Sequence, residues 1–162
     1  MTEDYSSVSL DDALAKAGPA AASFARLWER LWRQDHIPPE LLELCRLTLA
    51  RLHDDAVELA AASPAGVTVA RARRDAVIAG AAFDADGFSE GDRAVLLFAE
   101  YYWTDPQSIT DAVADDVKAH FGEPGLVFLI EALGCLDGRI RAARCLRAMS
   151  AHLPAKEPAY VG

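Results

Sequence analysis

Three observations predict an all-α protein, a compact bundle of six or seven helices joined by short loops. Alanine supplies about a fifth of the 162 residues and, together with leucine, arginine and glutamate, favours helices. Valine and isoleucine, from which strands are commonly built, are sparse and scattered. Apolar residues recur at three- and four-residue steps, which is the spacing of one helix face, and Gly or Pro residues separate these segments.

Four helices are predicted in the first half of the chain. A short one begins near Ser9, has acidic residues in its first turn and stops at Gly18. The next, over 19–35, begins with a proline, which suits the first turn of a helix. The third, over 38–62, is apolar on several sides, and this predicts a central position in the bundle. The fourth covers 68–82.

Three more helices are predicted after a turn-rich loop over 83–88. The first covers 89–103 and opens with the sequence Ser-Glu-Gly-Asp, which resembles a capping box. The second covers 106–121, and Gly122 stops it. The last is a long helix over 124–151, introduced by a proline.

The length suits one ordinary domain and is too short for two. We therefore expect a single helical domain over 9–153. A flexible N-terminus over 1–8 and a loose C-terminal tail over 154–162 are expected to flank it.

The charge balance points away from several classes of partner. Sixteen Lys and Arg residues against 25 Asp and Glu give a net charge of −9, which repels phosphate backbones and anionic lipid. We expect no nucleic-acid and no membrane partner, because in addition no apolar run approaches the roughly 20 residues of a membrane span. The acidic start of the chain is unlike a secretory signal, so a cytoplasmic location is expected.

The three cysteines, Cys45, Cys135 and Cys145, are widely spaced and form no Cys-x-x-Cys pair. Reduced, buried thiols are the simplest interpretation of this pattern. The chain also has no glycine-rich phosphate loop, no Gly-x-Ser-x-Gly and no His-Glu-x-x-His. The generic motifs therefore predict no particular chemistry.

His53 is the one histidine with a suggestive setting. It falls at the edge of the apolar stripe of its predicted helix, where a side chain can contact both the core and a cleft. Carboxylates of Glu43, Asp55 and Glu58 lie on the same predicted helix. One interpretation is a solvated face with pairs such as Arg51–Asp55. The other is a histidine and carboxylate cluster that transfers protons.

Two stretches of the chain carry a family resemblance. Their matching segments are 39–44, 66–68, 88–94, 98–100, 104–106 and 138–139. They resemble the carboxymuconolactone decarboxylase and alkylhydroperoxidase-D-like superfamily over about 110 residues. The resemblance implies a helical fold of the alkylhydroperoxidase-D-like type that assembles into a homo-oligomer, which is a dimer, trimer or hexamer.

The peroxidase branch of that superfamily carries a glutamate, a Cys-x-x-Cys and a histidine. Glu43 matches the glutamate, whereas Asp55 and Glu58 stand where the cysteines would be and Ala62 where the histidine would be. A thiol peroxidase needs a thiolate nucleophile and a resolving thiol, and a carboxylate supplies neither. The resemblance therefore implies a scaffold that has lost thiol peroxidase chemistry.

The decarboxylase branch is similar at other positions of the same segment. Arg51-Leu52-His53-Asp54 resembles its Arg-x-His-Glu pattern, and Gly-Val-Thr follows over 66–68. The second histidine of that branch is replaced by Glu58. One candidate acid or base thus remains, with an acidic residue where its partner would be.

The leading hypothesis is a non-redox enzyme that acts on a small organic substrate, of isomerase, lyase, cyclase or decarboxylase type, in a specialised biosynthetic pathway. No cofactor and no metal are expected. The expected catalytic residues are His53, Glu43, Asp55 and Glu58. The expected substrate-binding residues are Arg51, Tyr102, Trp103 and Arg139.

Two alternatives stay open. The first is a catalytically silent oligomer of the same fold that binds a ligand or a partner protein. The second, weaker one is a metal site made of His53, Asp54 and Glu58, although helical spacing places these side chains on different faces.

Overall fold

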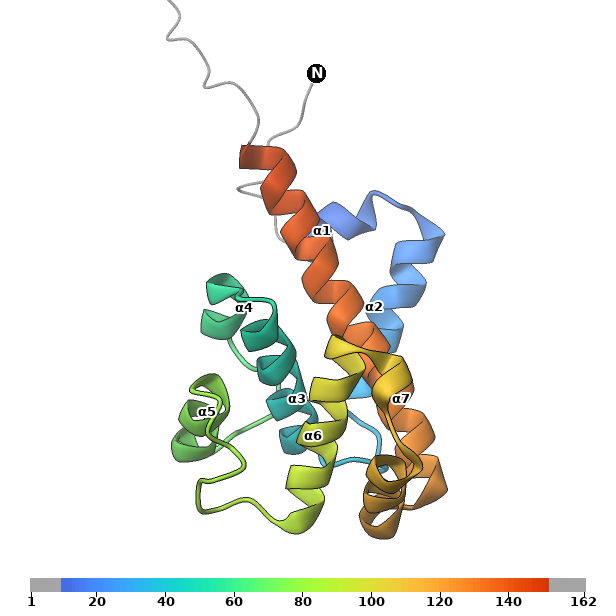
Figure 1. Ribbon diagram of the computed structural model, residues 1–162. Helices are drawn as coiled ribbons and strands as arrows, with labels where there is room; N and C mark the ends of the chain where they lie inside the picture. Colours follow the sequence, from blue (N-terminus) through green and yellow to red (C-terminus); the bar gives the residue numbers. More distant parts are fainter. Residues whose placement is uncertain (1–9, 152–162) are drawn as a thin grey trace, which may run out of the picture.

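The computed structural model describes residues 10–151, and it is all-helical over that range (Figure 1). Helices take up 74% of these residues, and there are seven of them and no strand within 10–151. The all-α prediction with six or seven helices is therefore confirmed. The predicted flexible N-terminus over 1–8 and the loose tail over 154–162 lie outside the described residues.

Helix α7 runs along the whole molecule, and α1, α3 and α6 contact it (Figure 1). Helices α1 and α2 lie on one side of α7, while α3 and α6 lie on the other; α4 and α5 extend from α3. The bounds are α1 Leu10–Ala15, α2 Pro19–Leu31, α3 Pro39–Leu52, α4 Ala56–Ala60, α5 Arg71–Ile78, α6 Glu90–Thr104 and α7 Asp111–Ala151, with a short 3-10 turn η2 over Pro106–Ser108.

Helix α3 forms the centre of the bundle, as its apolar character predicts. All ten residues from 41 to 50 are buried, and α3 contacts α4, α5, α6 and α7. Each fully buried leucine contributes about 1.5–3 kcal/mol through removal of apolar surface from water. Two of the ten buried residues are charged, Glu43 and Arg46, and these two side chains shape the candidate site.

The prediction of one continuous helix over 38–62 is wrong, because α3 ends at Leu52. Asp54 has a φ of 52°, in the left-handed region that aspartate tolerates better than most residues. Asp55 then caps α4, since its side chain accepts a hydrogen bond from the backbone N–H of Glu58 at 3.1 Å. Residues 55–62 therefore do not continue α3. The positions of Asp55 and Glu58 relative to His53 cannot be derived from the spacing of one helix.

The second half of the chain follows the prediction more closely. The capping box at the start of α6 is present, with Ser89 Oγ accepting from the Asp92 N–H at 3.1 Å and Asp92 Oδ2 accepting from the Ser89 N–H at 2.9 Å. In the first half, α5 departs from the prediction in length, because it covers Arg71–Ile78 instead of the range 68–82. The predicted restart at Pro106 produces only η2, and α7 begins at Asp111. The predicted interruption at Gly122 is present, because the backbone leaves helical geometry there with a φ of 70° and a ψ of 175°, and this kink divides α7 into two helical segments.

Helix α7 is also the one helix within residues 10–151 whose length and composition would allow it to cross a membrane. The core helix of a water-soluble protein meets the same criterion. Here α7 supplies Leu129, Leu133, Leu136 and Ile140 to the core. The cytoplasmic location that the sequence predicts stays a prediction.

Two glycines of α7 provide a matched pair of substitutions. Gly122→Ala places a side chain at a φ of 70°, and we expect a loss of about 1 kcal/mol in the free energy of unfolding. Gly138→Ala lies in regular helix with open space around the new methyl group, so we expect a gain of about 0.5–1 kcal/mol. Urea unfolding measures both values, and a change of the same sign in the two variants would contradict the kink at Gly122.

Candidate functional site

A buried ion pair lies at the centre of the bundle, one turn apart on α3. Glu43 is completely buried and Arg46 is 4% exposed. Arg46 Nε donates to Glu43 Oε2 at 2.7 Å, and its Nη2 donates to Glu43 Oε1 at 2.8 Å. The hydroxyl of Ser63 donates to Oε1 at 2.9 Å. This two-bond, fork-like arrangement is the strongest geometry for an arginine and a carboxylate.

The pair also connects α3 to the segments that follow it. The remaining terminal nitrogen of Arg46, Nη1, donates to the backbone carbonyl of Glu58 at 2.9 Å. Arg74 of α5 lies 3.7 Å from Glu43 Oε1 and donates to the carbonyl of Leu59 at 2.5 Å. These contacts hold α4 and α5 against α3. The bonds to Arg46 and Ser63 engage both oxygens of Glu43, so its role is to position Arg46.

A cavity of about 230 Å³ opens beside this pair. It is enclosed by α1, α2, α3, α4 with the loop after it, and α7. Its polar side chains are Arg46, Glu58 and Arg139, while the other walls are apolar. The apolar lining residues are Leu10, Trp28, Ala61, Ala62, Pro64, Leu136 and Ile140. A mostly apolar hollow with a few converging polar groups is the usual form of a small-molecule site.

Glu58 is the loosely held carboxylate of this cavity. Its Oε2 lies 3.5 Å from Arg46 Nη1 and its Oε1 lies 3.8 Å from Arg147 Nη1. Both distances exceed the 2.7–3.2 Å that is typical of an N–H···O hydrogen bond. The side chain is 18% exposed. Glu58 can therefore accept a hydrogen bond or a proton from a molecule in the cavity, unlike Glu43.

Arg139 of α7 forms the opposite polar wall. Its guanidinium carbon lies 4.4 Å from the centre of the Trp28 ring, a stacking geometry that favours the cation. Nη2 donates to Asp11 Oδ1 at 2.8 Å. The guanidinium is thus oriented by an aromatic face and by one carboxylate. Arg139 lines the cavity, and its predicted role in substrate binding stays a prediction.

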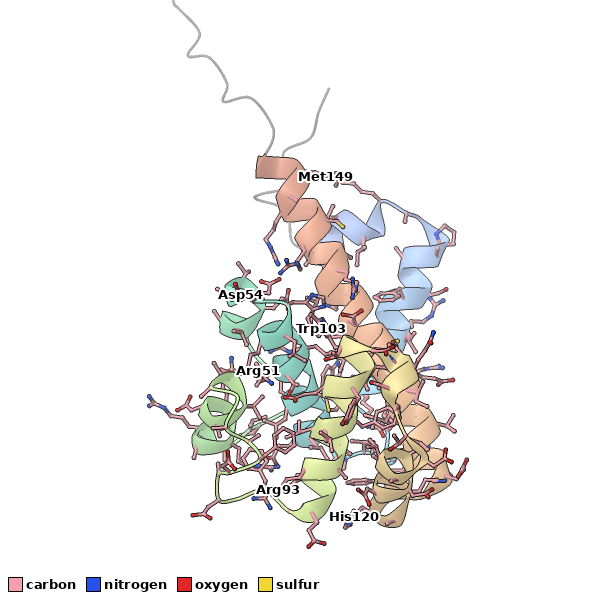
Figure 2. All side chains as sticks on the ribbon, viewed as in Figure 1. Arg51, Asp54, Arg93, Trp103, His120 and Met149 are labelled. Carbon is pink, nitrogen blue, oxygen red and sulfur yellow. The ribbon has the colours of Figure 1, made fainter. Side chains whose placement is uncertain are left out.

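His53 lies in a different cluster, at the junction of α3, α6 and α7. Its Nε2 is 2.5 Å from Asp137 Oδ1 and 3.2 Å from Trp103 Nε1. Trp103 Nε1 donates to this same nitrogen, and Trp103 packs edge-on against the imidazole with ring centres 5.6 Å apart. Figure 2 shows Trp103 at this end of α6, next to α7. His53 is not among the cavity residues.

Asp55 and Arg51 form ion pairs with more distant helices instead of with each other. Asp55 is 4% exposed, caps α4 and accepts a hydrogen bond from Arg147 of α7. Arg51 Nη2 donates to Glu100 Oε1 of α6 at 2.5 Å, and Figure 2 shows Arg51 between α3 and α5. The Arg51–Asp55 pair that a continuous helix would give is therefore replaced by two tertiary pairs.

Tyr102 belongs to the surroundings of His53 rather than to the cavity. Its hydroxyl lies 3.4 Å from where a Cβ on Gly134 would be. Burial and the nearby Asp137 carboxylate raise the pKa of the Tyr102 hydroxyl. The predicted site residues thus divide into two groups. Glu43, Glu58 and Arg139 lie in or directly behind the cavity, whereas His53, Asp55, Arg51, Tyr102 and Trp103 lie outside it.

The three thiols are unpaired, and no thiol is among the residues that line this cavity. Cys45 is fully buried in α3, and burial together with Asp92 and Glu43 raises the pKa of its thiol. Burial also raises the pKa of Cys135, while Cys145 is exposed. Within residues 10–151, no three His, Cys, Asp or Glu side chains are grouped so that they could hold a metal ion.

Sequence reasoning missed Arg46, Trp28, Asp137 and Arg147. Arg46 had a signal, because it stands three residues after Glu43 and is surrounded in sequence by leucines, where a lone charge would be costly. Trp28 had no local signal for its contact with Arg139, which depends on α2 and α7 being neighbours. Asp137 and Arg147 had no local signal, since their partners lie 84 and 92 residues away in the chain.

Comparisons of the chain with protein-family models, with curated proteins and with solved structures each found no match. The site is therefore described by its own geometry. Its chemical content is a buried glutamate and arginine pair, one loosely held carboxylate and a second arginine around an apolar cavity.

Glu43→Gln tests the buried ion pair. We expect the free energy of unfolding to fall by about 3 kcal/mol, because Arg46 would keep its charge in the core without an ionised partner at Glu43. Glu40→Gln is the matched control, since its carboxylate is 38% exposed and bonds Arg73 at 2.6 Å. That change is expected to cost less than about 1 kcal/mol. Equal losses in urea unfolding would show that the Glu43 pair does not organise the core.

Proposed function

We propose that this protein is a small-molecule enzyme that catalyses a non-redox, acid–base reaction in the cavity, with Glu58 as the group that transfers the proton. The observation that carries this proposal is the position of Glu58. It is a cavity-lining carboxylate beside a buried guanidinium, and its two oxygens have only long contacts with Arg46 and Arg147. A general base must lie within hydrogen-bond reach of the proton that it removes. Among the residues that line the cavity, Glu58 is the carboxylate.

The family resemblance supports the same location. The positions that match the peroxidase branch's glutamate, second cysteine and histidine are Glu43, Glu58 and Ala62. Glu58 and Ala62 both line the cavity, and Glu43 holds Arg46, which lines it too. We propose that the chain is a divergent member of the carboxymuconolactone decarboxylase and alkylhydroperoxidase-D-like superfamily whose site has changed from thiols to a carboxylate.

The residues of the cavity have different roles in the proposed proton transfer. Glu58 removes a proton from an acidic C–H of the substrate and becomes neutral. Arg46 or Arg139 then stabilises the negative charge that develops on an adjacent oxygen, in a cavity partly sheltered from water. Return of the proton to another carbon gives an isomerisation, and departure of a leaving group gives a lyase reaction. Neither step moves electrons to an external acceptor.

The remaining features of the proposal concern the setting of the protein. We propose a cytoplasmic homo-oligomer that serves a biosynthetic pathway and has no nucleic-acid or membrane partner. The net charge of −9 supports the absence of nucleic acid. Exposed apolar side chains support self-association, since they would be covered in an oligomer. They are Leu27, Val57, Val127, Ile130 and Met149.

A specific observation favours a second candidate, a ligand-binding oligomer without turnover. His53, the histidine that sequence reasoning favours as acid or base, is directed to Asp137 and is absent from the cavity lining. One carboxylate is then left to do the chemistry. A protein that only binds its ligand needs Arg46 and Arg139 but does not need Glu58 as a base.

Deuterium incorporation distinguishes the two candidates. The purified protein is incubated in deuterated water with a small-molecule extract of its native host, and mass spectrometry then identifies compounds that gain deuterium or disappear. We expect such a compound with the wild-type protein. We expect its rate of change to fall by about 100-fold or more in Glu58→Gln, because the proton-transferring group is removed.

Two control variants make this result specific. His53→Gln keeps a donor that can contact Asp137, and Glu131→Gln removes a charge from an exposed position of α7. Both are expected to retain the wild-type rate. Turnover that survives in Glu58→Gln and is lost in His53→Gln would move the chemistry to the His53 cluster. An extract that the wild-type protein leaves unchanged would favour the ligand-binding candidate.

A further inference from the structure

The ion pair between Arg139 and Asp11 joins two very different environments. The Arg139 side chain is 16% exposed and stacked on Trp28, whereas the Asp11 side chain is 68% exposed. Asp11 accepts from Arg139 Nη2 through one oxygen at 2.8 Å. An ion pair with so much solvent contact contributes little to stability. The guanidinium is therefore fixed by the protein, while its carboxylate partner is easily exchanged.

The helix that carries Asp11 is itself weakly anchored. Helix α1 has six residues, and none of them is buried. It contacts α2 and α7, and its first residue, Leu10, forms part of the cavity wall. A short helix with no buried residue can move at little cost, because few apolar contacts are broken. Movement of α1 would remove both Leu10 from the cavity and Asp11 from Arg139.

We propose that Arg139 is the carboxylate-binding group of the cavity and that Asp11 occupies it in the ligand-free protein as an internal competitor. A ligand with a carboxylate binds by displacing Asp11, and this displacement couples binding to movement of α1. The inference rests on the proposed function for the location of the ligand, and it deepens that function by naming the chemical class of the ligand.

The cavity limits the rest of the ligand to a compact apolar body. A guanidinium and a carboxylate form two parallel hydrogen bonds, so Arg139 selects a carboxylic acid over a neutral amide of the same shape. Trp28, Leu136 and Ile140 provide apolar walls for the remainder. Since a cavity of about 150 Å³ holds benzene, the volume of about 230 Å³ suits small acids such as benzoate.

Isothermal titration calorimetry with benzoate and hexanoate, and with their neutral amides, tests the proposal at constant ionic strength. We expect the acids to bind and the amides to bind at least about tenfold more weakly. Asp11→Asn is expected to bind the acids roughly two- to fivefold more tightly, because the competing carboxylate is gone. Arg139→Gln should weaken acid binding by about tenfold or more, with Arg139→Lys in between.

Asp86→Asn is the matched control for charge, because it removes one carboxylate from an exposed position in the loop before α6 and should leave both affinities unchanged. The proposal is overturned if Asp11→Asn binds no more tightly than wild type, if amides bind as well as acids, or if neither acid binds the Asp11→Asn protein at millimolar concentration. Circular dichroism of each variant shows whether a loss reflects unfolding.

The two proposals fail in different ways. If Asp11→Asn and Arg139→Gln bind the acids with the wild-type affinity while Glu58→Gln still loses deuterium exchange, only the carboxylate site is wrong. If the acid affinities of the Asp11 and Arg139 variants change as expected while Glu58→Gln exchanges deuterium at the wild-type rate, only the role of Glu58 is wrong.

Discussion

The buried pair of Glu43 and Arg46 constrains the rest of this structure. A charge inside the core is tolerated only when its partner and its hydrogen bonds are complete, so α3 must carry both residues on adjacent turns. The rest of Arg46 then requires acceptors after the end of α3, and the carbonyl of Glu58 supplies one. This requirement places α4 beside α3 and leaves the cavity next to the guanidinium. The shape of the site thus follows from satisfying one buried charge.

Helix α7 separates the polar side chains of the molecule into two clusters. Leu136, Arg139 and Ile140 face the cavity, while Asp137 contacts His53. Neighbouring residues on one helix point in different directions, so the two clusters share a backbone without sharing a space. Asp137 and Trp103 enclose the imidazole of His53, which gives it a role in joining α3 to α7. The cavity is left with a carboxylate and two guanidiniums, a set that suits proton transfer next to a stabilised anion.

The sequence allowed the helices to be predicted because their signals are local. The apolar stripe of α3, the capping box at Ser89 and the glycine at 122 all act within one or two turns. The break after Leu52 was not predictable in this way, since it depends on Asp54 adopting a positive φ and on Asp55 finding Arg147 in α7. That break changes where several of the predicted site residues lie. Glu43, Glu58 and Arg139 gather at the cavity, whereas His53 and Asp55 contact Asp137 and Arg147 of α7.

The most direct test of this account is to locate the bound ligand by its effect on the tryptophan side chains. The chain has three tryptophans, of which Trp28 lines the cavity, Trp103 contacts His53 and Trp32 lies in the core. Each gives its own indole N–H resonance in a nitrogen-15 correlation spectrum, and Trp→Phe variants assign them. On titration with benzoate, the account predicts that the Trp28 resonance moves progressively while the Trp103 resonance stays in place. A shift of Trp103 with no change at Trp28 would place the ligand at the His53 cluster and contradict the account.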